Sequence, residues 1–230
     1  NYAPNGVADY TVMLMLLSLR KYKPALWRAQ VNDYSLAGLQ GRELRNLTVG
    51  ILGTGKIGAA VIKNLSGFGC RILASDIREN PSLKGLCTYV DNETLYKACD
   101  IISLHMPLLD STRHFVNAET IAKMKDGVTI INCARGELMN IPDMIRGIET
   151  QKIGALALDV FDKEDGIYHE NRRDDILSNR DMAYLRQFPN VIMTQHMAFY
   201  TDAAVQSMVF CGIEGLCDFA KTGHTETELV

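Results

Sequence analysis

Three ionisable side chains that could carry out acid–base chemistry lie after apolar runs of the sequence. Arg135 follows GVTIINCA, Glu164 lies just past ALALDVF, and His196 follows VIMTQ. Arginine binds a carboxylate through two parallel hydrogen bonds, and histidine gives and takes a proton near neutral pH. A carboxylate beside that histidine raises its pKa and fixes its tautomer. The reduction of a 2-oxo acid needs these three contributions, so the trio predicts an oxidoreductase.

Each of these residues also has a plainer interpretation. A histidine that closes an apolar run is more often structural than catalytic. Arg135 could pair with surface acids, and Glu164 lies in an acid-rich loop beside Asp162 and Asp165. The functional interpretation therefore requires a fold that brings the three side chains to one place.

Short β-branched and apolar runs alternate along the chain with segments of helical period. The runs are LTVGIL, RILAS, DIISLH, GVTIINC, ALALDVF and VIMTQH, and between them lie IGAAVIKNL, ETLYKAC, AETIAKM and IPDMIRGIE. This alternation predicts an α/β fold, a doubly wound parallel sheet with helices on both faces. Ligands bind such sheets at the carboxyl ends of the strands, where the three residues would lie. The charged stretch 162–181 is predicted to be a solvated loop.

The first run ends in GTGKIG, which places Gly53, Gly55 and Gly58 between a strand and a helix. Gly53 allows a tight turn, Gly55 leaves room for a pyrophosphate, and Gly58 lets helix and strand pack closely. The helix N-terminus directs amide hydrogens at the phosphates. Asp76 ends the next strand, where it could bind a ribose 2′-hydroxyl and repel a 2′-phosphate. The motif predicts NAD rather than NADP, and Arg78 leaves the NADP alternative open.

Composition and charge exclude several classes of function. The 230 residues are 47% hydrophobic and 22% charged, and the formal net charge of −3 gives no basic field for nucleic acid. The apolar run at 11–19 is too short to span a bilayer, so a cytoplasmic protein without a membrane partner is expected. No metal site is predicted, because no cluster of ligands has a suitable spacing. The cysteines form no CxxC pair and are predicted to be reduced and buried: Cys70, Cys87, Cys99, Cys133, Cys211 and Cys217.

Five motifs carry a family resemblance. VGILGTGKIG, SLHMPL, INCARGEL, ALDVFDKE and TQHMAFYT, in this order and spacing, resemble the D-isomer-specific 2-hydroxyacid dehydrogenases, most closely the D-lactate dehydrogenase branch. The resemblance covers essentially the whole chain. It implies that Arg135, Glu164 and His196 are catalytic, and that Tyr2, Arg135, His196 and Phe199 contact the substrate. The residues that it implies for NAD binding are Gly53, Thr54, Gly55, Lys56, Ile57, Gly58, Asp76, His105, Pro107, Cys133, Ala134 and Asp159.

The resemblance also implies a mechanism and a reaction. Hydride would pass between the nicotinamide and C2 of the substrate, with Arg135 on the carboxylate and Glu164 holding His196 as imidazolium. His196 would give the proton in reduction and take it in oxidation. The expected reaction is the reduction of pyruvate to D-lactate. The alternatives are a larger D-2-hydroxy acid (2-hydroxyisocaproate, phenyllactate or 2-hydroxyglutarate) and a corepressor-like protein that binds NADH without turnover.

The sequence departs from the family pattern close to the expected site. Met139, Asn140 and Ile141 stand where a valine, an aspartate and a threonine are usual, and Gln195 replaces the proline before the histidine. These changes flank the chemistry without removing it. Asn140 could alter the surroundings of the site.

The expected organisation has three parts. They are an interdomain segment at 1–22, a dinucleotide-binding domain at 23–197 and a C-terminal helix that returns to the substrate lobe at 198–230. The chain starts where the family's N-terminal substrate lobe ends, so we expect a truncated chain. The apolar face of the helix at 201–221 should then be partly exposed. The helix at 7–19 resembles the family's dimer-forming segment, which predicts a homodimer.

Overall fold

A seven-stranded parallel sheet forms the centre of the protein. The computed structural model describes residues 4–225, so Tyr2 lies outside the described residues. The strands are β1 (Thr48–Leu52), β2 (Arg71–Ser75), β3 (Thr88–Tyr89), β4 (Ile101–Leu104), β5 (Val128–Asn132), β6 (Ile153–Leu158) and β7 (Val191–Met193). Their order is β3-β2-β1-β4-β5-β6-β7. The chain changes direction across the sheet between β1 and β4, which is where doubly wound sheets bind ligands.

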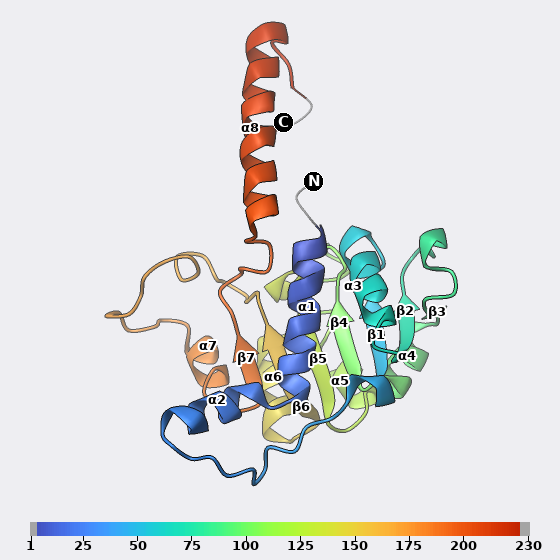
Figure 1. Ribbon diagram of the computed structural model, residues 1–230, viewed down its shortest axis with the longest axis vertical. Helices are drawn as coiled ribbons and strands as arrows, with labels where there is room; N and C mark the ends of the chain where they lie inside the picture. Colours follow the sequence, from blue (N-terminus) through green and yellow to red (C-terminus); the bar gives the residue numbers. More distant parts are fainter. Residues whose placement is uncertain (1–3, 226–230) are drawn as a thin grey trace.

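Helices cover both faces of the sheet (Figure 1). On one face, α1 (Pro4–Leu19) packs against α3 (Lys56–Ser66). The other face carries α4 (Asn92–Ala98), α5 (Ala118–Lys123), α6 (Ile141–Glu149) and α7 (Arg180–Leu185). The other helices are α2 (Tyr22–Gln30), α8 (Asp202–Thr222) and the short 3-10 turns Leu44–Asn46, Pro81–Leu83 and Gly136–Leu138. The expected doubly wound fold is confirmed.

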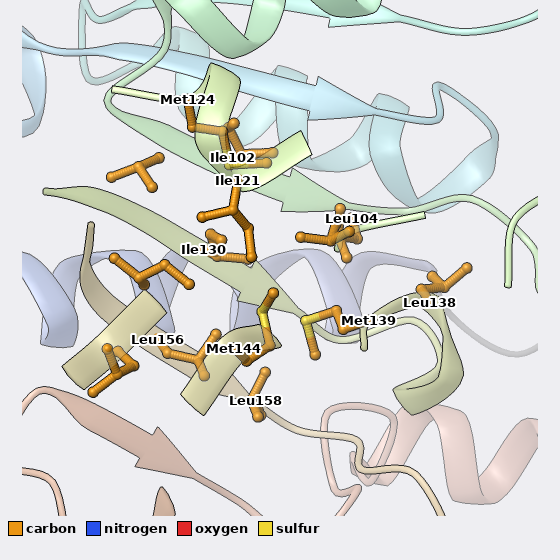
Figure 2. Close-up of a cluster of buried hydrophobic side chains, with 14 of the residues drawn as sticks. Ile102, Leu104, Ile121, Met124, Ile130, Leu138, Met139, Met144, Leu156 and Leu158 are labelled. Atoms are coloured by element: carbon orange, nitrogen blue, oxygen red, sulfur yellow. The ribbon is translucent and has the colours of Figure 1, made fainter. Parts of the chain in front are cut away.

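The sheet separates two hydrophobic clusters, because successive side chains of a strand point to opposite faces. In β1, Val49 and Ile51 join the cluster under α1 and α3, whereas Leu52 joins the cluster under α4, α5 and α6. Figure 2 shows this second cluster, whose labelled side chains include Ile102, Leu104, Ile121, Ile130, Met144, Leu156 and Leu158. Burying one such side chain contributes roughly 1.5–3 kcal/mol, so the two clusters hold the strand ends firmly in place.

The predicted strands and helices are all present, with three differences. β7 ends at Met193 rather than continuing to His196, because hydrogen bonds to Asp159 pull the chain after Thr194 out of the sheet. The sequence did not predict α2, α7 or the two-residue strand β3. The charged stretch is irregular up to Asn179, but its last two residues begin α7.

The C-terminal helix α8 extends away from the sheet and its covering helices (Figure 1). Its large apolar side chains are exposed, namely Val209, Phe210, Ile213, Leu216 and Phe219, which confirms the expected exposure. Cys211 and Cys217 are exposed as well, so their predicted burial is wrong: few residues pack against this helix. By its length and mean hydropathy of 1.2 alone, α8 would also qualify as a membrane-spanning helix.

Candidate active site

His196 and Glu164 meet at the carboxyl edge of the sheet. Glu164 follows β6 and His196 follows β7, and Nδ1 of His196 lies 2.5 Å from Oε1 of Glu164. The hydrogen bond to Glu164 raises the pKa of His196 above its ordinary value, although burial opposes it. Burial raises the pKa of Glu164, but the bonds from His196 and from the Phe161 amide outweigh it and lower that pKa overall. The pair therefore favours an imidazolium beside a carboxylate.

Asp159, directly after β6, fixes the backbone on both sides of His196. Its side chain is fully buried. Oδ1 accepts hydrogen bonds from the Thr194 hydroxyl at 2.6 Å and the Met197 amide at 3.0 Å, and Oδ2 accepts from the Ala198 amide at 2.8 Å. The chain turns sharply between these groups, and the φ angle of His196 is 54°, in the left-handed region. This conformation is costly for a residue other than glycine, so the bonds to Asp159 hold the imidazole in its place.

Arg135 is positioned by Asn132, the last residue of β5. The buried Asn132 side chain donates from Nδ2 to the Arg135 carbonyl at 2.8 Å and accepts from the Ala134 amide at 2.9 Å. The guanidinium is exposed, and it interacts electrostatically with both Glu164 and His196. The structure thus brings Arg135, Glu164 and His196 from three separate strand ends to one site.

A cleft beside Arg135 contains most of the residues expected to bind the cofactor. Its volume is about 560 Å³, and it is lined by Gly55, Lys56, Ile57, His105, Met106, Pro107, Leu108, Cys133, Ala134 and Arg135. The glycine turn has the geometry that the motif requires: a Cβ on Gly58 would lie 2.0 Å from the Gly53 carbonyl oxygen, and Gly53 has a φ of +94°. A Cβ on Gly55 would meet nothing within 4 Å, so this part of the turn is open to a ligand. The cleft and the N-terminus of α3 fit a dinucleotide.

Asp76 is tied to the glycine turn. Its Oδ2 accepts hydrogen bonds from the Thr54 amide at 2.5 Å and the Thr54 hydroxyl at 3.0 Å, and its Oδ1 accepts from the Arg78 amide at 3.2 Å. Burial raises the pKa of Asp76, but these bonds outweigh it and lower that pKa, so the carboxylate is charged at neutral pH. Directly after β4, which lies on the other side of β1 from β2, burial lowers the pKa of His105 to about 4 and leaves its ring neutral. The neutral imidazole of His105 therefore lines the cleft, and the charged Asp76 is bonded to Thr54 of the glycine turn.

Most of the chain matches a known protein family. Residues 12–198 match the family described as "D-isomer specific 2-hydroxyacid dehydrogenase, NAD binding domain". The chain belongs to this family. It is therefore an NAD-dependent dehydrogenase of D-2-hydroxy acids, and the predicted cofactor, NAD, is confirmed.

Individual relatives agree on the family and differ in their substrates. An aromatic 2-oxoacid reductase of Clostridium sporogenes is 44% identical over all 230 residues, which cover 70% of that protein. A D-lactate dehydrogenase of Curvularia clavata is 37% identical, and the chain covers 66% of it. The solved structure of a D-lactate dehydrogenase from Sporolactobacillus superimposes with a TM-score of 0.94 at 35% identity, over the whole of this chain and 69% of that one.

The structure places the other predicted residues of this dehydrogenase as follows. Phe199 lies edge-on to His196, with ring centroids 6.2 Å apart, and its contact with substrate stays a prediction. Asp159 has its carboxylate oxygens bonded to the loop after β7, so its contact with NAD stays a prediction. Asn140 accepts from the Asp143 amide at 3.2 Å and caps α6, which gives this departure from the family pattern a structural role.

Three residues that the sequence analysis did not single out complete the site. Asn132 and Thr194 position Arg135 and the loop of His196, and each ends or closely follows an apolar strand. A polar residue at the end of a buried strand was the available signal. The third is His169, whose Nε2 lies 3.1 Å from the carbonyl oxygen of His196. Nothing in the charged stretch 162–181 distinguished it from its neighbours.

Proposed function

We propose that this dehydrogenase reduces a 2-oxo acid, with Arg135 binding the carboxylate and His196 donating the proton. The pairing of His196 Nδ1 with Glu164 is the observation that carries the proposal. The hydrogen bond to Glu164 occupies Nδ1 of His196, so Nε2 is the nitrogen that gives its proton to the substrate. Glu164 keeps the ring protonated because its negative charge favours imidazolium.

The reaction adds two hydrogens across the 2-oxo group. NADH, held by the glycine turn and the cleft beside Arg135, would supply the hydride for C2. The carbonyl π electrons move to oxygen, which takes the proton from His196 Nε2 and becomes the hydroxyl of the product. His196 is then neutral and regains a proton from solvent. Arg135 contributes by holding the carboxylate and by drawing electron density from the adjacent carbonyl.

We propose an aromatic 2-oxo acid as the preferred substrate. The sequence identity of 44% to an aromatic 2-oxoacid reductase supports this choice. So does the group of rings at the site, since His169, His196 and Phe199 lie with their centroids 6.2 Å apart in each pair. A planar aromatic side chain could pack against such faces and edges. Pyruvate, the substrate expected from the sequence, is the second candidate, supported by the 37% identity to a D-lactate dehydrogenase.

The homodimer and the cytoplasmic location also stay predictions.

The test is the oxidation of NADH in the presence of phenylpyruvate or pyruvate, with NADPH in parallel. His196→Asn is the informative variant, because asparagine tolerates the left-handed backbone found at this position. We expect turnover with NADH, a higher kcat/KM for phenylpyruvate, and a loss of about 10²–10⁴-fold in kcat for the variant. His114→Asn is the control, since His114 is a second histidine with a left-handed φ, 52°. Full activity of His196→Asn would contradict the proposed role.

A further inference from the structure

His169 contacts the main chain of His196, whereas Glu164 contacts its ring. Glu164 and His169 belong to one short segment, in which the Glu164 carbonyl accepts the amides of Ile167 and Tyr168 and closes a helical turn. From this turn, Glu164 reaches Nδ1 of the His196 ring, and the His169 ring reaches the His196 carbonyl oxygen at 3.1 Å. One segment therefore holds both the side chain and the backbone of His196.

We infer that His169 is a positioning residue of the reaction, which fixes His196 by a hydrogen bond from its Nε2 to the His196 carbonyl. The inference rests on the proposed role of His196 as the proton donor. His169 does not touch the reacting atoms in this scheme. It acts by restricting the peptide that follows the imidazole, and with it the direction in which the imidazole points.

The backbone of His196 needs this restraint. Its φ of 54° lies in a region that residues other than glycine rarely occupy, so the peptide would relax if its partners were removed. Asp159 binds the two amides that follow, those of Met197 and Ala198. Those bonds do not involve the carbonyl of His196 itself. The His169 ring donates a hydrogen bond to that carbonyl.

The ring of His169 also contacts the wall of the site. Its centroid lies 6.2 Å from that of His196, with the planes inclined at 46°, and 6.2 Å from that of Phe199 in an edge-on contact of 69°. A phenyl ring could reproduce these contacts but could not donate the hydrogen bond. An amide side chain could donate the bond but would lose the ring contacts. The two functions of His169 can therefore be separated by substitution.

The hydrogen bond does not depend on the charge of His169. An imidazole donates from Nε2 both as imidazolium and as the neutral tautomer protonated at Nε2. The charged and titratable groups around the His196 ring are Glu164, Asp159, Arg135 and His169. Of these, Glu164 is the hydrogen-bond partner of the ring. Loosening the backbone of His196 would lengthen that bond and weaken its effect on the ring.

The experiment compares His169→Phe with His169→Gln in the full chain. Steady-state kinetics with NADH and a 2-oxo acid, the pH profile of kcat and NADH binding by fluorescence are measured for both. We expect kcat to fall about tenfold in His169→Phe, with NADH affinity unchanged. The decline of kcat at alkaline pH should begin at a lower pH in that variant. His169→Gln should recover most of kcat and the wild-type pH profile, because its amide can donate to the same carbonyl.

Two further variants make the result decisive. His169 itself has a left-handed φ of 63°. His114→Phe places the same side chain at a histidine with a similar φ, 52°, and controls for the cost of a phenylalanine in that backbone conformation. His196→Asn tests the proposed function separately. If His196→Asn is inactive while His169→Phe keeps the kcat and pH profile of the wild type, the inference is wrong and the proposed function stands. If His169→Phe and His169→Gln lose kcat and NADH binding equally, His169 is only structural and the inference is likewise wrong.

Discussion

Glu164 and His196 are 32 residues apart in the sequence, yet Oε1 of one lies 2.5 Å from Nδ1 of the other. The pair forms because two parallel strands, β6 and β7, end side by side at the same edge of the sheet. Both side chains are largely shielded, with 29% of His196 and 23% of Glu164 exposed, so solvent screens their interaction only in part. The protonation state of His196 therefore depends on Glu164.

The pH dependence of reduction should follow from this pair. His196 must be protonated to act, and its pKa lies above the ordinary 6.5 because of the bond to Glu164. The rate of reduction should hold through neutral pH and fall as the pH rises through that raised pKa. Glu164→Gln removes the negative charge, so the fall should begin at a lower pH, with a loss of roughly tenfold or more at slightly alkaline pH. The kcat profile measures this, with Asp165→Asn as a control for an acid in the same loop.

Stability should depend on pH through the same two residues. The folded pKa of His196 is raised, so its contribution is complete below about pH 6.5 and is lost as the pH rises through the folded value. The folded pKa of Glu164 is lowered, so its contribution is present above about pH 4.5 and is lost as the pH falls through the folded value. The pair should stabilise the protein most between these limits. Urea unfolding of the wild type and Glu164→Gln, measured from below to above these limits, should show a difference that is largest between them and shrinks on both sides, and a constant difference would contradict the prediction.

Asp159 should contribute to the stability of the fold mainly through its hydrogen bonds, and less through its negative charge. Asp159→Asn keeps the size of the side chain but gives one end an NH₂ group, which cannot accept the Met197 or Ala198 amide. We expect a loss of about 2 kcal/mol in the free energy of unfolding, because buried amides lose their acceptor. Activity should fall as well, since the loop carrying His196 is released. Asp126→Asn, at a side chain that is 93% exposed, should change neither property.

The sequence predicted the fold and the trio for a clear physical reason. Apolar runs such as GVTIINC can be buried only in a sheet covered on both faces, and parallel strands end at one edge, where Arg135, Glu164 and His196 follow them. The turn after β7 was not predictable in the same way. VIMTQH has the apolar character of a strand up to its histidine, and only the distant carboxylate of Asp159 ends that strand at Met193. His169 was missed because its role comes from a contact with the His196 carbonyl, 27 residues away, and no local pattern indicates that contact.

Asp76 should determine the choice between NADH and NADPH. Its carboxylate is charged and held beside the glycine turn by Thr54, so a 2′-phosphate bound there would meet a fixed negative charge. Asp76→Ser should weaken NADH binding by about tenfold and improve NADPH relative to NADH, with Arg78 as a partner for the phosphate. Binding constants for both nucleotides, measured for the wild type and the variant, test this. An Asp76→Ser protein that still rejects NADPH as strongly as the wild type would show that discrimination lies elsewhere.

Tyr168 should be a position where a substitution stabilises the protein. Among residues 4–225, its hydroxyl is buried without a hydrogen-bond partner. Burial and then the negative charges of Glu164 and Asp159 raise its pKa, so the group stays a neutral phenol. A buried hydroxyl without a partner costs about 1–3 kcal/mol, and Tyr168→Phe removes the hydroxyl while it keeps the ring that packs against the core. We expect Tyr168→Phe to raise the free energy of unfolding by about 1 kcal/mol in urea titrations, with kcat unchanged. Tyr184→Phe removes a hydroxyl that binds Glu149 on the surface and should not stabilise the protein. A destabilised Tyr168→Phe variant would show that the hydroxyl has a partner in solution, and a lowered kcat would assign that partner to the site.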